Sequence, residues 1–451
     1  MTPAFAVVGH PNKGKSSIVA TLAQDDSVAI SAQSGTTQVT ETLQVEVGSS
    51  RFQLIDTPGF QRPTRVLQWL EQHAENADQR QAAVQQFVSD PECWKQFPDE
   101  VELLRPIVDG AVILYVVDGS RPYGAEYEAE MEILRWTGQA SMALINPIEN
   151  EQYIAPWQQA LSQYFKVVRV FNAMQADFDK QLSILEAFSY LREDWKEQIK
   201  ALIEAYQEQR TLQRQQSVHV LAAMLTDMCS SQVSQKVLSR EQARQLQPVL
   251  EKRFYSALVK REREAHEQLK GLYHYHHLDV KSSELPTEDN LFDTEKWILW
   301  GLNRRQLLVA AAMAGAATGA MVDLGLAGHS LFLGALTGGL LAGGGAWFGA
   351  DRLADFKIRG LPVGGYEARQ GPMKNRNFPY VLVSRFLFLN AALQQRTHAR
   401  RDSLSIEEGE LSGRIEGLAA PQQKELHRQM EKLSQQRGAE NLEAALAPLF
   451  D

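Results

Sequence analysis

The chain of 451 residues is too long for one ordinary domain, so we expect two or three domains. Its composition, 44% apolar and 22% charged, is that of a globular rather than a disordered protein. The formal net charge of −9 argues against wholesale nucleic-acid binding, which needs a basic surface that displaces counterions, so no nucleic-acid partner is expected.

The N-terminal residues predict a cytoplasmic start, because no charged stretch precedes an apolar run of the kind that forms a secretory signal. The two cysteines, Cys93 and Cys229, are far apart and match neither a disulfide framework nor a metal-binding spacing. Both features fit a reducing compartment.

The first 180 residues alternate short β-rich runs with polar, helix-compatible stretches. This pattern predicts an α/β domain with a mostly parallel sheet and helices on both faces. An insert of roughly residues 62 to 106 precedes the fourth strand, and in it a helix should begin after Pro63 and break near Pro91. The expected strands are Phe5–Val8, Gln38–Val47, Phe52–Ile55, Ala111–Val117, Met142–Ile145 and Val167–Val170.

The segment after the first expected strand has the spacing G-x-x-x-x-G-K-S of a phosphate loop. Glycines let backbone N–H groups curl around phosphates, and Lys15 would neutralise their charge. The hydroxyl of Ser16 would coordinate Mg²⁺. The residues expected to contact the nucleotide are Gly9, Asn12, Lys13, Gly14, Lys15, Ser16 and Ser17.

Two further motifs follow at the spacing that such a site requires. The run from Asp56 to Gly59 ends the third strand, where an aspartate holds Mg²⁺ through water and the glycine amide meets a γ-phosphate. Between the two motifs lies Ser34-Gly35-Thr36-Thr37, whose hydroxyls would complete the Mg²⁺ shell only in the triphosphate state.

These motifs together resemble the Era and TrmE families of translation-factor-class GTPases. The resemblance rests on Gly-x-Pro-Asn-x-Gly-Lys-Ser, then Gly-Thr-Thr, then Asp-Thr-Pro-Gly, then Asp118 after an apolar strand, and covers about 175 residues. It implies binding of GTP and GDP with Mg²⁺, and GTP hydrolysis. Beyond these residues the chain is similar to bacterial GTPases with a C-terminal domain of unknown function, which implies no mechanism.

The resemblance also assigns roles to single residues. It implies that Thr37, with Thr36 as the fallback, binds Mg²⁺ together with Ser16 and Asp56. The residues expected to act in hydrolysis are Lys15, Thr37 and Gly59.

The base-recognition motif of that family, Asn-Lys-x-Asp, reads Asn146-Pro147-Ile148-Glu149 here. A carboxylate is kept, but its reach is longer by one methylene. The last motif, usually Ser-Ala, reads Asn172-Ala173, where the Ala173 N–H would meet the guanine O6. We therefore expect GTP to be preferred over ATP, with Asn146, Glu149, Asn172 and Ala173 around the base.

Phe60 follows Gly59 at the place where classical regulatory GTPases carry a water-orienting glutamine. Because phenylalanine cannot polarise water, hydrolysis would need a group from a partner, a dimer mate or a cation. Asn12 matches the asparagine that helps to bind K⁺ in potassium-dependent members of the family. The alternative is that Asn12 only stabilises the loop.

Residues 181 to 295 have a helical pattern. Apolar residues at three- and four-residue spacing from Ile184 to Tyr206 predict one stripe of an amphipathic helix. A second helix should begin at a capping box made by Ser239 and Gln242.

Residues 296 to 360 have a different composition. Leu307–Val322 and Ser330–Ala350 are uncharged and rich in Gly, Ala and Leu, with small residues four apart and basic residues on both flanks. This pattern predicts a hydrophobic hairpin associated with the inner face of the plasma membrane. The alternatives are a hairpin buried in a soluble core and one buried against a partner protein.

The sequence thus predicts a GTPase domain over residues 1–180, a helical domain over 181–295, the hairpin over 296–360 and a C-terminal helical region over 361–451. The expected function is a GTP-hydrolysing switch that acts through a membrane-associated effector domain, with an unknown protein partner and dimerisation through the GTPase domain. One alternative is a soluble Era-like GTPase of ribosome or RNA maturation. The other is a dynamin-like GTPase that remodels membranes.

Overall fold

The computed structural model describes residues 2–27, 40–282, 357–358, 361–362, 366–373, 375–406 and 411–450. The chain divides into two compact units, each assembled from separate stretches of sequence. Unit 1 contains Met1–Gln213, Lys270–Asp279 and Ala392–Ser403. Unit 2 contains Arg214–Leu269, Val280–Ala391 and Leu404–Asp451.

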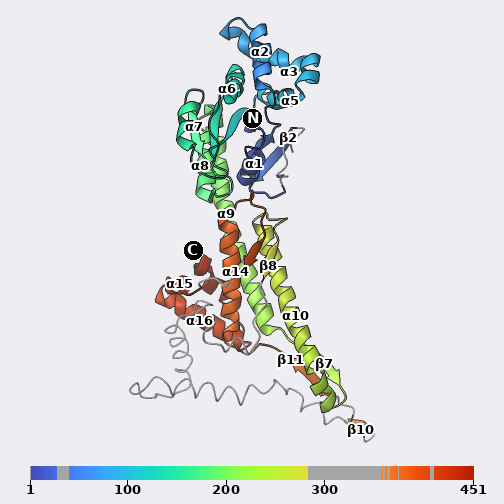
Figure 1. The fold of residues 1–451 in the computed structure, drawn as a ribbon. Helices are drawn as coiled ribbons and strands as arrows, with labels where there is room; N and C mark the ends of the chain where they lie inside the picture. Colours follow the sequence, from blue (N-terminus) through green and yellow to red (C-terminus); the bar gives the residue numbers. More distant parts are fainter. Residues whose placement is uncertain are drawn as a thin grey trace. The chain divides into compact units, whose positions relative to one another are not determined.

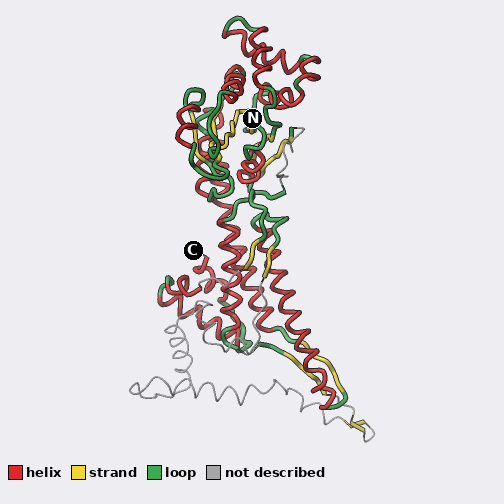
Figure 2. The backbone as a smooth tube through the Cα atoms, viewed as in Figure 1, coloured by secondary structure: helices red, strands yellow, loops and turns green. Residues whose placement is uncertain are grey.

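A six-stranded sheet forms the centre of unit 1 (Figures 1 and 2), with the order β2-β3-β1-β4-β5-β6. Only β2 is antiparallel to its neighbour, which confirms the expected, mostly parallel α/β fold. The predicted start of β2 at Gln38 lies outside the described residues. The strands are β1 Ala4–Val8, β2 Glu41–Val47, β3 Ser50–Asp56, β4 Val112–Asp118, β5 Ser141–Asn146 and β6 Val167–Val170.

Helices cover both faces of this sheet. Successive side chains of a strand point to opposite faces, and the side chains on both faces are apolar and buried. On one face, Phe5 and Val7 pack in a cluster with residues of α1 (Lys15–Ala23) and α8 (Phe178–Phe188). On the other face, Ala6 and Val8 join a cluster with α2, α3, α5, α6 and α7. The bounds of α6 and α7 are Glu126–Trp136 and Ile154–Leu161.

The insert before β4 is a small helical lobe. Its first helix begins at Pro63, as predicted, but ends at His73 instead of continuing to the break near Pro91, where a new helix begins. A third proline, Pro98, occupies the first turn of α5, where its missing N–H costs no helical hydrogen bond. The helices are α2 Pro63–His73, η1 Ala77–Gln79, α3 Arg80–Ser89, α4 Pro91–Gln96 and α5 Pro98–Val108.

The apolar stripe from Ile184 to Tyr206 does not form one helix, which corrects the sequence-based prediction. The chain leaves α8 after Phe188, makes the short η2 (Glu193–Trp195) and continues as α9 (Lys196–Ser230). The stripe is nevertheless buried against the sheet of unit 1. Unit 1 therefore continues to Gln213, beyond the expected domain end at residue 180.

Two later stretches, residues 270–279 and 392–403, also belong to unit 1, and we call them the return segments. They hold each other through Tyr275, whose hydroxyl donates to the Arg396 carbonyl at 2.6 Å. They hold the core through the buried Asp26, whose carboxylate accepts the His276 and His277 N–H groups at 2.7 and 2.9 Å. The Arg401 guanidinium donates to the carbonyl of Asp26 as well.

Unit 2 is mainly helical, as expected, but short strands interrupt it. β7 (Val233–Val237) pairs with β11 (Tyr366–Gln370), and β8 (Val280–Ser282) pairs with β12 (Leu404–Ile406). A third pair joins β9 (Lys357–Ile358) and β10 (Leu361–Pro362). The helices that contribute to this unit are α9, α10 Arg240–Leu272, α14 Phe378–Gln395, α15 Leu411–Glu416, α16 Ala420–Ser434 and α17 Leu442–Leu446, followed by the short η5 Ala447–Phe450.

The predicted capping box at the start of α10 is present, since Ser239 Oγ accepts the Gln242 N–H at 3.2 Å. The Gln242 side chain reaches back to the N–H of Leu238 at 3.0 Å. The predicted hairpin from Leu307 to Ala350 lies outside the described residues. Within the described ranges, no helix combines the length and hydropathy that a bilayer crossing requires.

Candidate nucleotide-binding site

The phosphate loop connects β1 to α1 through residues that need unusual backbone angles. Gly9, Asn12 and Gly14 have φ values of 143°, 61° and 81°, in the region that favours glycine. A Cβ on Gly9 would lie 2.4 Å from the Val116 carbonyl oxygen, so a side chain has no room there. The loop ends at the N-terminus of α1, where free N–H groups favour an anion.

Lys15 lies inside this loop and is 8% exposed. Its Nζ donates to the carbonyl oxygens of His10 at 3.1 Å and Gly9 at 3.4 Å. Burial lowers the pKa of the Lys15 ammonium, while Asp56 and Glu130 act in the opposite direction. The ammonium is thus held at the loop by acceptors that a phosphate can replace.

Asp56 and Ser16 meet beside the loop, although they are forty positions apart. The Ser16 hydroxyl donates to Asp56 Oδ2 at 2.6 Å, and Asp56 is buried at the end of β3. A hydroxyl and a carboxylate are the hard oxygen ligands that Mg²⁺ prefers. The two side chains therefore fit the predicted Mg²⁺ site.

The run after Asp56 is packed against the phosphate loop. The Phe60 N–H donates to the Gly9 carbonyl at 3.2 Å, and the Thr57 hydroxyl donates to the Val7 carbonyl at 2.8 Å. A Cβ on Gly59 would lie 2.5 Å from the Pro11 nitrogen. The backbone of Gly59 is therefore placed directly against the loop that would hold the phosphates.

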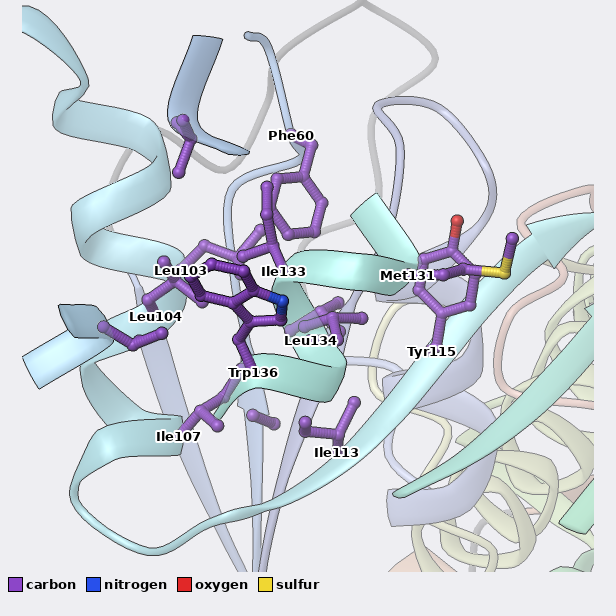
Figure 3. Packing of buried hydrophobic residues seen from close by; sticks show 14 of the residues in the cluster. Phe60, Leu103, Leu104, Ile107, Ile113, Tyr115, Met131, Ile133, Leu134 and Trp136 are labelled. Atoms are coloured by element: carbon purple, nitrogen blue, oxygen red, sulfur yellow. The ribbon is translucent and has the colours of Figure 1, made fainter. Parts of the chain in front are cut away.

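The side chain of Phe60 is fully buried. It belongs to the same apolar cluster as Leu103, Ile133 and Trp136 (Figure 3). The side chain therefore anchors the segment in the core. Thr36 and Thr37, the predicted ligands from the first switch, lie outside the described residues.

Asn146 connects the phosphate loop with the two base motifs. Its Nδ2 donates to the Lys13 carbonyl at 3.2 Å, and its Oδ1 accepts the Ala173 N–H at 3.2 Å. The Asn172 side chain in turn donates to the Pro147 carbonyl at 3.1 Å. These hydrogen bonds bring together Asn146, Asn172 and Ala173, which are predicted to lie around a base. A guanine O6 would have to share the Ala173 N–H with Asn146 Oδ1.

The carboxylate of Glu149, the last residue of the base motif, forms an ion pair with Arg121, a residue that the sequence did not single out. The Arg121 guanidinium donates to Glu149 Oε1 at 2.9 Å, and the two side chains are 56% and 60% exposed. Asp118 lies three residues before Arg121. Its carboxylate accepts the Ser120 N–H at 2.9 Å and lies 3.7 Å from the Lys13 ammonium.

A buried acid beneath the loop was also missed. Glu130 of α6 has a fully buried side chain and accepts hydrogen bonds from His10 at 2.8 Å and Tyr115 at 2.9 Å. Burial raises the pKa of the Glu130 carboxyl, against the opposing effects of His10, Tyr115 and Lys15. Glu130 lies in an ordinary acidic helix, so no local pattern marks it.

Among the described residues, no cluster of His, Cys, Asp and Glu side chains suits a metal ion.

Comparisons with known proteins agree with this geometry. Residues 4–146 match the family described as "50S ribosome-binding GTPase", and residues 158–447 match "Domain of unknown function (DUF3482)". The chain is 41% identical over 69 residues to "GTPase Der" of Symbiobacterium thermophilum, a match that covers 15% of each protein. It is 30% identical over 124 residues to "GTPase Der" of Mycoplasma pneumoniae, covering 28% of this chain and 22% of that protein.

The chain therefore spans less than a quarter of the length of these two relatives. A solved structure of Era with MgGDPNP and nucleotides 1506-1542 of 16S ribosomal RNA is 13% identical over 60% of this chain and 89% of that one. Its TM-score is 0.31, too low to carry weight. The second family covers more than half of the chain, so the protein belongs to the DUF3482 family, and its N-terminal part matches the "50S ribosome-binding GTPase" family.

Proposed function

We propose that this protein binds GTP with Mg²⁺, hydrolyses it to GDP, and uses the two nucleotide states as a switch for its C-terminal domain. The observation that carries the proposal is the convergence of Lys15, the Ser16–Asp56 pair and the Gly59 backbone at one loop. The family match over residues 4–146 supports the same activity.

Each of these groups has a task in phosphoryl transfer. Lys15 balances charge on the phosphates, and the Gly59 amide is available to the γ-phosphate that GDP lacks. Ser16 and Asp56, with Thr37, would hold Mg²⁺, which neutralises charge that develops between the phosphates. Because the Phe60 ring is buried in the core, it cannot orient the attacking water.

The water must therefore be oriented by a group outside this set. We propose K⁺ seated beside Asn12, an exposed residue at the turn of the loop, or a second GTPase domain in a homodimer. Turnover should then be faster in K⁺ than in Na⁺ at matched ionic strength, and Asn12→Ala should remove the difference. Equal rates in both salts that rise with protein concentration would favour dimerisation instead.

Lys15→Ala tests the central proposal. Loss of a charge-assisted phosphate contact should weaken GTP binding by several kcal/mol, on the order of a hundredfold or more. Titration with a fluorescent GTP analogue measures this, and Lys95→Ala, at a surface lysine that pairs with Glu92, is the matched control. Unchanged affinity in Lys15→Ala, with an unchanged circular dichroism spectrum, would refute the nucleotide site.

For the C-terminal domain we propose an effector role at the inner face of the plasma membrane. The support is the pair of uncharged Gly/Ala/Leu runs between residues 307 and 350, with Arg304, Arg305 and Arg352 on their flanks. A second candidate, favoured by the name of the matched GTPase family, is action on the large ribosomal subunit. Cosedimentation of the full chain with anionic liposomes and with ribosomal subunits, each in GTP-analogue and GDP states, distinguishes the two.

A further inference from the structure

A buried carboxylate in the insert holds the backbone that follows Gly59. Glu100 of α5 is 1% exposed, and its Oε1 accepts the N–H groups of Gln61 at 2.9 Å and Arg62 at 2.5 Å. Arg62 is the N-cap of α2 but makes no side-chain cap of its own. Glu100 thus provides, from another helix, the acceptor that a helix N-terminus requires, and its negative charge suits that end of α2.

The same turn of α5 makes a second contact with a segment from elsewhere in the chain. The Glu102 carbonyl accepts the Thr40 hydroxyl at 3.0 Å, and Thr40 directly precedes β2. One short helix therefore binds the segment that enters β2 and the segment that enters α2. Both segments lie next to motifs of the proposed nucleotide site.

The position of α5 itself is fixed by apolar packing. Val101, Leu103, Leu104 and Ile107 are fully buried, and Figure 3 shows three of them in the cluster that contains Phe60. A displacement of α5 would have to repack this cluster. The Glu100 carboxylate is thus a fixed point relative to the backbone of residues 59–62.

Residues 59 to 62 form a continuous connection from the phosphate loop to this fixed point. Gly59 packs against Pro11, the Phe60 N–H bonds to Gly9, and the next two N–H groups bond to Glu100. Glu100 limits rotation of the peptide units at Gln61 and Arg62, and through Phe60 this restraint extends to the segment that carries the Gly59 amide. Glu100 does so without being part of the loop.

We propose that Glu100 is a positioning residue for the triphosphate state, which couples the helical insert to recognition of the γ-phosphate. The inference rests on the proposed function, because it assigns the γ-phosphate contact to the Gly59 amide. It predicts an effect on GTP that GDP does not show, since GDP has no group at that amide. It also makes the insert the part of unit 1 through which a bound partner would change hydrolysis.

The test compares three variants of the full chain. Glu100→Ala removes the acceptor, and Glu100→Gln keeps a neutral one. Glu102→Ala changes the next acidic residue of the same helix while keeping the backbone carbonyl that binds Thr40. Hydrogen bonds to a charged group are among the stronger ones in proteins, so Glu100→Ala should lower the ratio of GTP-analogue to GDP affinity roughly tenfold or more. The catalytic constant should fall by a similar factor while GDP affinity stays the same.

Glu100→Gln should give an intermediate ratio, at least about twofold below the wild type, because neutral hydrogen bonds are roughly half as strong. Glu102→Ala should match the wild type. An equal loss of GTP and GDP affinity in Glu100→Ala would indicate a merely structural role and overturn the inference. If Glu100→Ala does not fold, a wild-type ratio in Glu100→Gln overturns it. Failure of the wild type to bind GTP would refute the proposed function instead.

Discussion

The phosphate end and the base end of the proposed site are built from different parts of the chain. At the phosphate end, backbone geometry is decisive: a Cβ on Gly9 or Gly59 would lie within 2.5 Å of a neighbouring backbone atom. At the base end, side chains make the contacts, as in the pair of Glu149 with Arg121 and the bonds of Asn146. Few residue types other than glycine fit the backbone geometry of the phosphate end. At the base end, one polar side chain can take the place of another.

This difference agrees with where the sequence departs from the Era/TrmE pattern. The phosphate loop and the run to Gly59 follow that pattern, while the base motif reads Asn-Pro-Ile-Glu. Asn146 is the residue of that motif whose bonds reach the phosphate loop, and it is the one that is kept. Asn146 thus connects the two ends of the proposed site.

Asn146→Ala should have the largest effect at this end, because it removes the connection. Both of its bonds are at buried or half-buried groups, and each polar partner left without a bond costs about 1–3 kcal/mol. GTP and GDP affinity should fall together, by tenfold or more, and the melting temperature should drop. Isothermal titration and thermal unfolding measure the two effects.

The matched control for this change is Asn150→Ala, which removes an exposed asparagine that only caps the local turn at Gln152. A loss confined to GTP in Asn146→Ala would contradict the proposed connection. Such a result would place Asn146 in recognition of the γ-phosphate.

Glu149→Ala should have a smaller and more selective effect. If Glu149 binds the guanine edge, its removal should lower the preference for GTP over ATP by about tenfold, a loss of about 1.4 kcal/mol. Competition of unlabelled GTP and ATP against a fluorescent GTP analogue measures the preference. Equal competition by ATP and GTP in the wild type would rule out guanine specificity.

Arg121→Ala is the matched variant. It should change GTP affinity in the opposite direction, and its effect should be the smallest of the three. It releases Glu149 from an exposed ion pair worth about 0.2–1 kcal/mol, so GTP affinity should rise by up to a few-fold. A fall in affinity would show instead that Arg121 contacts the nucleotide directly.

The sequence could predict the features that local patterns mark, but not the contacts between residues that are distant in the chain. Glycine spacing, β-rich runs and prolines are local signals, so the phosphate loop, the sheet, the helix start at Pro63 and the break near Pro91 could be predicted. Glu100, Glu130 and Arg121 act on residues that are 15 to 120 positions away, and no local pattern marks them. The break between α8 and α9 was missed because the apolar stripe continues through it: both helices pack on the same sheet face.

The return segments have a consequence for the synthesis of the protein. Unit 1 includes residues up to Ser403, some 190 positions after Gln213. At a synthesis rate of about 5–20 residues per second, roughly 10 to 40 seconds separate the emergence of these two residues. Asp26 lacks the N–H groups of His276 and His277 until those residues emerge, and the apolar cluster lacks Ala399 until nearly the end of this interval. Unit 1 therefore completes its fold only after Ser403 has emerged, and a nascent chain that stalls before Ser403 exposes an unfinished core to chaperones and proteases.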